Sequence, residues 1–207
     1  MNNILMNTEM AKAILDGRKT QARRVVKVRT DINKKEWVDT LIPDYAKYKI
    51  GETIWVKEPF VIEGSSLNKN GILTYHEEPI VHYKASEKDL KWIDEWEDEV
   101  NVPWKSAIHM NKEMARIFLK ITDVRVERLQ DITFQDTTRE GLPFDVDICC
   151  EDIGHKAKLN TAIFDSEVEM KVWWINAWNK TAPKGYKWDD NPYVFVYEFE
   201  TTHGANR

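Results

Sequence analysis

Three cationic side chains stand at short spacing in one stretch of the chain: Arg18, Lys19 and Arg23. Gly17 precedes them at a position typical of a helix end, and an extended segment follows. We expect the Lys19 ammonium to project from this turn into a cleft, where loss of water would lower its pKa. Such an amine can act as a base or stabilise a developing charge. The alternative is an exposed lysine on a turn.

The arginines of this stretch are suited to phosphate, because a guanidinium offers a planar fork of donors that matches phosphate oxygens. Residues two apart in a strand share a face, so we expect Arg23 to point with Lys19 and Gln21. The sequence therefore predicts that Arg23, with Arg18 nearby, holds phosphate. The alternative is a solvated basic strand that is balanced by acidic surface elsewhere.

Three further candidates lie later in the chain. Glu58, just before Pro59 at the predicted end of a strand, can hydrogen-bond the edge of a base or pair with an arginine of the first stretch. The sequence leaves these two alternatives open. Trp55 can stack on a base or pack in the core. His109 is an acid, a base or a phosphate ligand, or else a hydrogen-bonded structural residue.

Charge distribution limits the class of partner. The 207 residues carry a formal net charge of −5, which excludes a broadly basic nucleic-acid coat. Residues 11–30, the basic segment, nevertheless hold seven Lys and Arg against one Asp. Residues 87–99, the acidic segment, hold seven Asp and Glu against two Lys. We therefore expect a small basic cleft in an acidic protein, a setting that favours a short or single-base ligand.

Other classes of site lack their sequence signals. The five histidines show no metal-ligand spacing, and the adjacent Cys149 and Cys150 have no second pair with which to bind zinc. No phosphate-binding loop or dinucleotide fingerprint is present, so we expect no metal and no cofactor. No apolar run is long enough to cross a bilayer, and adjacent cysteines suit a reducing compartment. We expect a cytoplasmic protein with no membrane partner.

Apolar periodicity and capping residues predict the elements that position these side chains. They indicate strands at 4–6, 21–28, 53–60, 114–129 and 193–200, and helices at 8–16, 133–140 and from 167 onward. This order predicts an α+β fold with a closed or half-closed barrel. Residues 61–104 are predicted to be an insertion, made of a hairpin (72–77 with 80–84) and an acidic helix (87–100). Residues 143–163 are predicted to be a variable loop.

Several segments in this order resemble the ASCH domain family of the PUA-like superfamily, and above all its larger members encoded by bacteriophages and prophages. The segments are 14–24 (ILDGRKTQARR), 51–60 (GETIWVKEPF), 106–117, 129–132, 140–142 and 191–195. The resemblance implies a single domain over 1–207, a small β-barrel flanked by helices, and a cleft beside the GRKT turn. Members are thought to bind RNA or modified nucleobases. Some small bacterial members remove acetyl from acetylcytidine, and others are described as ribonucleases.

The resemblance also implies roles for residues. Glu140 matches the acid that partners the lysine of the amidohydrolases, so a pair of Lys19 and Glu140 would shuttle a proton during acyl transfer. The alternatives are an exposed carboxylate or a structural ion pair. Ala22 stands where those enzymes carry a nucleophilic threonine, and Thr20 is about 7 Å away along the strand. This departure argues against the acetylcytidine reaction by that mechanism.

Three hypotheses follow. The first is a module that binds nucleic acid, with RNA or another single strand favoured, or a modified nucleobase. The second is an amidohydrolase or ribonuclease that uses Lys19 and Glu140 as its catalytic pair. The third is a phage protein that binds a host protein in the bacterial cytoplasm through the acidic segment and its tryptophans. The candidate ligand-contacting residues are Arg18, Lys19, Thr20, Arg23, Trp55, Glu58, His109 and Glu140.

Overall fold

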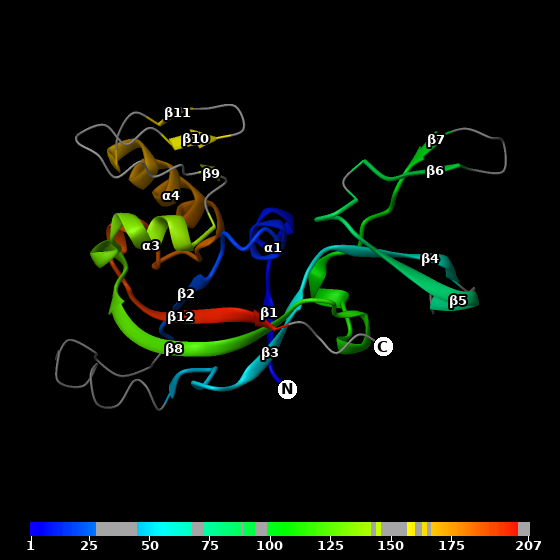
Figure 1. Ribbon diagram of the computed structural model, residues 1–207, viewed down its shortest axis with the longest axis horizontal. Helices are drawn as coiled ribbons and strands as arrows, with labels where there is room; N and C mark the ends of the chain where they lie inside the picture. Colours follow the sequence, from blue (N-terminus) through cyan, green and yellow to red (C-terminus); the bar gives the residue numbers. More distant parts are fainter. Residues whose placement is uncertain are drawn as a thin grey trace. The chain divides into compact units, whose positions relative to one another are not determined.

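The computed structural model describes residues 1–27, 45–67, 73–87, 89–93, 99–141, 144–145, 157–159, 163–164 and 167–202. Figure 1 shows the chain coloured along the sequence. In chain order its elements are β1 (Asn3–Leu5), α1 (Thr8–Leu15), β2 (Gln21–Val25), β3 (Thr53–Lys57), β4 (Phe60–Leu67), β5 (Leu73–Tyr83), β6 (Lys91–Ile93), β7 (Glu99–Asn101), η1 (Ala107–His109), η2 (Lys112–Met114), β8 (Phe118–Arg128), η3 (Leu129–Asp131), α3 (Phe134–Arg139), β9 (Phe144–Asp145), β10 (Ala157–Leu159), β11 (Ile163–Phe164), α4 (Glu167–Thr181), η4 (Trp188–Asp190) and β12 (Tyr193–Thr202).

The predicted α+β class is confirmed. Five strands form one mixed sheet in the order β1-β3-β8-β12-β2, in which β1 and β3 are parallel and β12 and β2 antiparallel. Of the predicted closed or half-closed barrel, the closed form is not seen. Closure requires the two edge strands to hydrogen-bond to each other. Within the described residues β1 and β2 remain the two ends of the strand order.

Local signals fix the elements around the basic segment as predicted. The Asn7 side chain accepts a hydrogen bond of 2.8 Å from the backbone N–H of Met10 at the start of α1. Gly17, with φ +74°, ends that helix in the left-handed region. Thr133 and Asp136 form a capping box at the start of α3, and Gly141, with φ +84°, follows its end.

The chain divides into two compact units, which we describe separately. Unit 1 comprises residues 1–12, 55–118 and 203–207, and unit 2 comprises residues 13–54 and 119–202. The core of unit 2 contains the buried residues Leu129, Ile132, Trp174, Val194 and Val196, with Trp173, Trp178 and Trp188 packed against them. A core cluster of unit 1 contains Trp55, Phe60, Ile62 and Met110. The prediction of one domain over 1–207 stays a prediction.

The internal structure predicted for residues 61–104 is wrong in two respects. The hairpin does not turn at Glu78-Pro79, because β5 continues from Leu73 to Tyr83 and pairs with β4. The register jumps from Glu63 opposite Ile80 to Ser65 opposite Tyr75. Residues 76–79 of β5 therefore lie in an irregularity, where a proline that lacks an N–H is tolerated.

The acidic helix predicted at 87–100 is also wrong where the structure describes it. Lys91–Ile93 and Glu99–Asn101 are the antiparallel strands β6 and β7, with Trp92 opposite Val100. The helical spacing of Leu90, Ile93 and Trp96 was misleading, because aromatic and β-branched residues favour strands.

The predictions for the cysteines and loop 143–163, and for membrane-spanning segments, concern residues that the structure describes only in part. Cys149, Cys150 and most of 143–163 lie outside the described residues. Across the residues that are described, no helix combines the length and apolar character that crossing a bilayer requires.

Candidate functional site

Lys19 and Glu140 meet in unit 2, although 121 positions separate them in the sequence. The Lys19 ammonium donates one hydrogen bond to the backbone oxygen of Glu140 and one to its carboxylate, each at 2.8 Å. A backbone bridge joins the same two residues. Lys19 is only 2% exposed, so it is not the solvated lysine of the alternative interpretation.

The environment of this pair shifts the pKa of both groups downward. Burial lowers the pKa of Lys19, and the opposing attraction of Glu140 does not fully restore it. Burial alone would raise the pKa of Glu140, but Lys19 and Arg23 outweigh burial and hold it below its usual value. The carboxyl is thus kept ionised, and the amine gives up its proton more readily than an exposed lysine.

Arg23 is also buried, with 2% exposure, and it binds three carboxylates. Its guanidinium nitrogens lie 2.6 Å from a Glu127 oxygen, 3.0 Å from a Glu140 oxygen and 3.2 Å from an Asp136 oxygen. Glu127 lies on β8, Asp136 on α3 and Glu140 just after α3. The sequence predicted that Arg23 holds phosphate, but in this structure the Arg23 guanidinium forms ion pairs with protein carboxylates.

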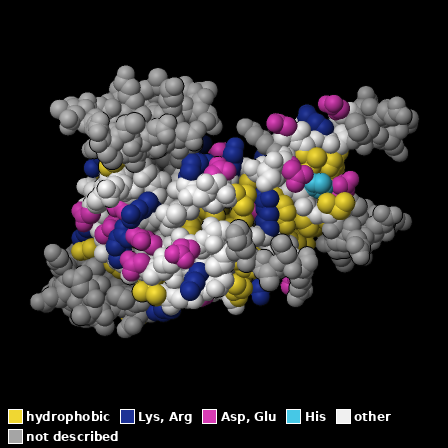
Figure 2. Space-filling model, viewed as in Figure 1, with side chains coloured by type: hydrophobic (Ala, Val, Ile, Leu, Met, Phe, Trp, Pro, Cys, Tyr) yellow, Lys and Arg dark blue, Asp and Glu magenta, His cyan; other side chains and the backbone are white. Residues whose placement is uncertain are grey.

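Arg125 on β8 extends this arrangement toward solvent. It pairs with Asp136 at 3.0 Å, with Glu127 at 3.3 Å and with Glu198 of β12. We call the set the ionic cluster; its members are Lys19, Arg23, Arg125, Glu127, Asp136, Glu140 and Glu198. Three cations thus face four carboxylates. On the face drawn in Figure 2, basic and acidic side chains likewise lie beside one another. The positive charge of Lys19 and Arg23 is therefore compensated.

Gln21 differs from the members of the ionic cluster. In the sequence it lies between Lys19 and Arg23, and its side chain is fully buried. Neither its amide nitrogen nor its amide oxygen has a hydrogen-bond partner. Burial alone would raise the pKa of Asp136, but Thr133, Arg23 and, last, the nearby Gln21 amide lower it. The positions of the amide atoms do not meet the geometry of a hydrogen bond. Each buried polar atom without a partner costs roughly 1–3 kcal/mol.

Other predicted residues of unit 2 lie at the border of the cluster. Arg18 pairs with Asp16 at 2.8 Å and donates to the backbone oxygen of Gly141 at 3.3 Å. Thr20 is exposed. Ala22 is fully buried and pairs with Tyr197. Neighbouring residues of a strand point to opposite faces, so Ala22 faces away from the cluster that Arg23 enters.

The remaining predicted residues belong to unit 1. Trp55 lies in the core, and His109 is exposed at the end of η1. Glu58, 1% exposed, accepts two hydrogen bonds from Arg116, at 2.9 and 3.0 Å. Arg116 in turn lies 4.0 Å from the centre of the Tyr83 ring. The partner of Glu58 is thus an arginine that the sequence did not single out.

No family model, curated protein or solved structure matches the chain. The site must therefore be interpreted from its own geometry. Within the parts of the chain that are described, no group of three His, Cys, Asp or Glu side chains is placed to hold a metal ion. Lys19 and the carboxylates can exchange protons, and together with Gln21 they can form hydrogen bonds, which are stronger in a setting shielded from water.

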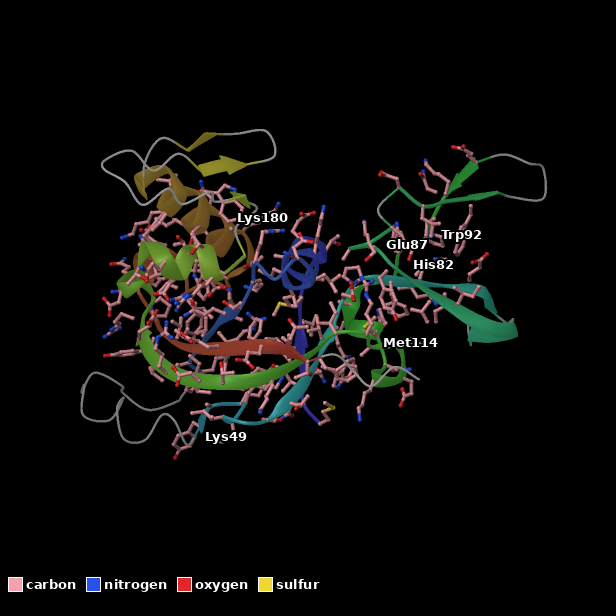
Figure 3. All side chains as sticks on the ribbon, in the orientation of Figure 1. Lys49, His82, Glu87, Trp92, Met114 and Lys180 are labelled. Atoms are coloured by element: carbon pink, nitrogen blue, oxygen red, sulfur yellow. The ribbon has the colours of Figure 1, made fainter. Side chains whose placement is uncertain are left out.

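His82 of unit 1 is a titratable residue that the sequence gave no reason to choose. One ring nitrogen lies 2.6 Å from Glu87 and the other 2.8 Å from Glu63; His82 and Glu87 are labelled in Figure 3. Both nitrogens can donate only when the ring is protonated. Burial alone would lower the pKa of His82, but the two carboxylates outweigh burial and raise it.

We therefore expect His82 to stay protonated above pH 6.5, the usual histidine value. Because the folded pKa is raised, the contribution of this ring to stability is complete below about pH 6.5. It is lost as the pH rises through the folded pKa. Ring ¹⁵N chemical shifts, followed by NMR from pH 5.5 to 9, measure this titration.

Glu63→Gln and Glu87→Gln should each lower the pKa of His82. Glu113→Gln, at an exposed glutamate in η2 of the same unit, is the matched control and should leave it unchanged. A ring that loses its proton below pH 6.5 in the wild-type protein would contradict the assignment.

Proposed function

We propose that the chain is a PUA-like module of the ASCH type that binds a base of single-stranded nucleic acid, with RNA favoured, or a modified nucleoside, at the ionic cluster. The observation that carries this proposal is the compensation of the buried Lys19 and Arg23 by carboxylates that are themselves only 9–16% exposed. Buried charges are costly, and they gather at functional sites more often than elsewhere. A site of this composition selects its ligand by hydrogen bonds and not by attraction for phosphate.

The expected salt dependence follows from this difference. Each phosphate contact on a single strand contributes about 0.7 to the slope of log K against log salt. We expect a slope of about −1 or shallower for a short single-stranded RNA, because the buried cations already have partners. Fluorescence anisotropy with single-stranded and duplex RNA and DNA, between 50 and 500 mM salt, measures the slope. A slope of about −4 or steeper, as six phosphate contacts would give, contradicts the proposal.

A separate assay distinguishes binding from catalysis. The lowered pKa of Lys19 and its 2.8 Å contact with Glu140 favour a proton-transfer enzyme as the second candidate. If the protein releases acetate from N4-acetylcytidine, and Lys19→Met abolishes the release, the amidohydrolase is the correct function. Ala22 has no hydroxyl and faces away from the cluster, so the nucleophile would then be another group, for which we propose water.

The host-protein hypothesis has less support. It relies on the acidic segment and its tryptophans. The described part of that segment includes strand β6 and the first residue of β7, and it supplies no observation in favour of a protein partner.

A further inference from the structure

We propose that the Gln21 amide is the group that recognises the ligand, by pairing with a planar edge that presents a hydrogen-bond donor beside an acceptor. This inference rests on the proposed function and adds the selecting residue and the chemistry of the ligand edge. The inference is based on the contrast between Gln21, which has no hydrogen-bond partner, and the charged groups beside it, which have partners.

The charged neighbours of Gln21 are satisfied by one another. Asp136 accepts hydrogen bonds from the Thr133 backbone N–H and hydroxyl and pairs with Arg23 and Arg125. Glu127 pairs with the same two arginines. Gln21 shares the interior of this unit and is fully buried, yet both of its amide atoms have no partner. Buried polar groups normally have partners, so two unused groups call for an explanation, and we infer that a ligand supplies the partners.

The chemistry of the amide defines the ligand. A carboxamide holds a donor and an acceptor side by side in one plane, so it forms two parallel hydrogen bonds with a matching edge, as Gln does with adenine. Each of the four nucleobases has such an edge. Phosphate has acceptors only, and it would meet the carboxylate of Asp136. The ligand group that contacts Gln21 is therefore the base and not the backbone.

Access to the amide requires a local rearrangement, because Gln21 is fully covered. Arg125 is the least buried cation of the ionic cluster, with a side chain 33% exposed, and it links Asp136 on α3 to Glu198 on β12. Displacement of Arg125 would release Asp136, the carboxylate on which the Gln21 amide acts. We place the entrance at this arginine.

The first test uses the wild-type protein. Adenosine, cytidine, guanosine and uridine are titrated by calorimetry, each beside an analogue with a methylated edge: N6,N6-dimethyladenosine, N4,N4-dimethylcytidine, 1-methylguanosine and 3-methyluridine. We expect the nucleoside that binds to lose roughly 10- to 100-fold in affinity on methylation. Equal affinity for the nucleoside and its methylated analogue would overturn the inference.

The second test replaces the amide. Gln21→Met keeps the length of the side chain and removes both unpaired atoms, so we expect nucleoside binding to fall by the same factor while Tm rises by about 2–4 °C. Gln130→Met is the matched control, because Gln130 is exposed and its amide donates to the Trp188 backbone oxygen at 3.0 Å. The control should change neither nucleoside affinity nor, by more than about 1 °C, the Tm.

The outcomes separate this inference from the function on which it rests. If the wild-type protein binds a nucleoside and Gln21→Met binds it equally well, Gln21 is not the recognising group and the proposed function stands. If Gln21→Met lowers Tm, the amide has a structural partner and the inference fails. If no nucleoside binds to the wild-type protein and no oligonucleotide does, the proposed function fails and the inference fails with it.

Discussion

Replacing Arg23 with methionine is expected to lower the free energy of unfolding by roughly 3–5 kcal/mol, the range for removing one partner of a buried ionic network. Arg23 is the cation shared by Glu127, Asp136 and Glu140. Its loss leaves three carboxylates crowded in a site with little water, where only Lys19 and Arg125 oppose them. Urea unfolding of the wild-type protein and the variant, followed by circular dichroism, measures the difference.

Arg139→Met is the control for the loss of one positive charge. Arg139 lies at the end of α3, its side chain is 51% exposed, and its contact with Glu198 is long, at 3.8 Å. Exposed pairs of this kind contribute about 0–1 kcal/mol, so the control should be nearly as stable as the wild-type protein. Equal losses in Arg23→Met and Arg139→Met would show that net charge, and not the buried network, determines stability.

Gly141→Ala is expected to destabilise the protein by roughly 2–4 kcal/mol and to weaken ligand binding. Gly141 has φ +84°, and an added Cβ would lie 2.6 Å from the Lys19 Cβ and 2.8 Å from the Ala13 Cβ. A Cβ at that distance forces Lys19 to shift, and the Lys19 ammonium then leaves Glu140. Thermal unfolding and the nucleoside titrations measure the two effects.

Gly185→Ala separates backbone strain from steric contact. Gly185 has nearly the same backbone angle, φ +83°, and an added Cβ there would meet nothing within 4 Å. Only the left-handed conformation opposes that substitution, at about 1–2 kcal/mol. If the two alanine variants lose the same stability, the close approach of Gly141 to Lys19 does not contribute to the free energy lost in Gly141→Ala.

The parts of the site that depend only on residues close together in the sequence were predictable from the sequence. Gly17 and Gly141 mark helix ends, and Thr133 with Asp136 marks a helix start; each signal lies within a few residues of the element it controls. The alternation of side chains along a strand also placed Lys19, Gln21 and Arg23 on one face. These predictions need only local geometry.

The partners of the basic segment were not predictable in the same way. Glu127 is 104 positions from Arg23, and nothing in its own surroundings on β8 distinguishes it from a solvated acid. Asp136 carried a signal as the third residue of a capping box, but that signal indicates a helix start and not a contact with Arg23. The Glu58–Arg116 pair and the register of β5 likewise depend on strand pairing that local patterns do not specify.

The distance in sequence between the basic segment and its carboxylates has a consequence during synthesis. Lys19 and Arg23 are synthesised more than a hundred positions before Glu127, Asp136 and Glu140, the carboxylates that compensate them. Chains are made at about 5–20 residues per second, so these two cations lack those partners for several seconds. The positive charge that these carboxylates compensate in the folded protein is thus without them in the nascent chain. Only when Glu140 has been added, just after α3, can Lys19 and Arg23 pair with the full set.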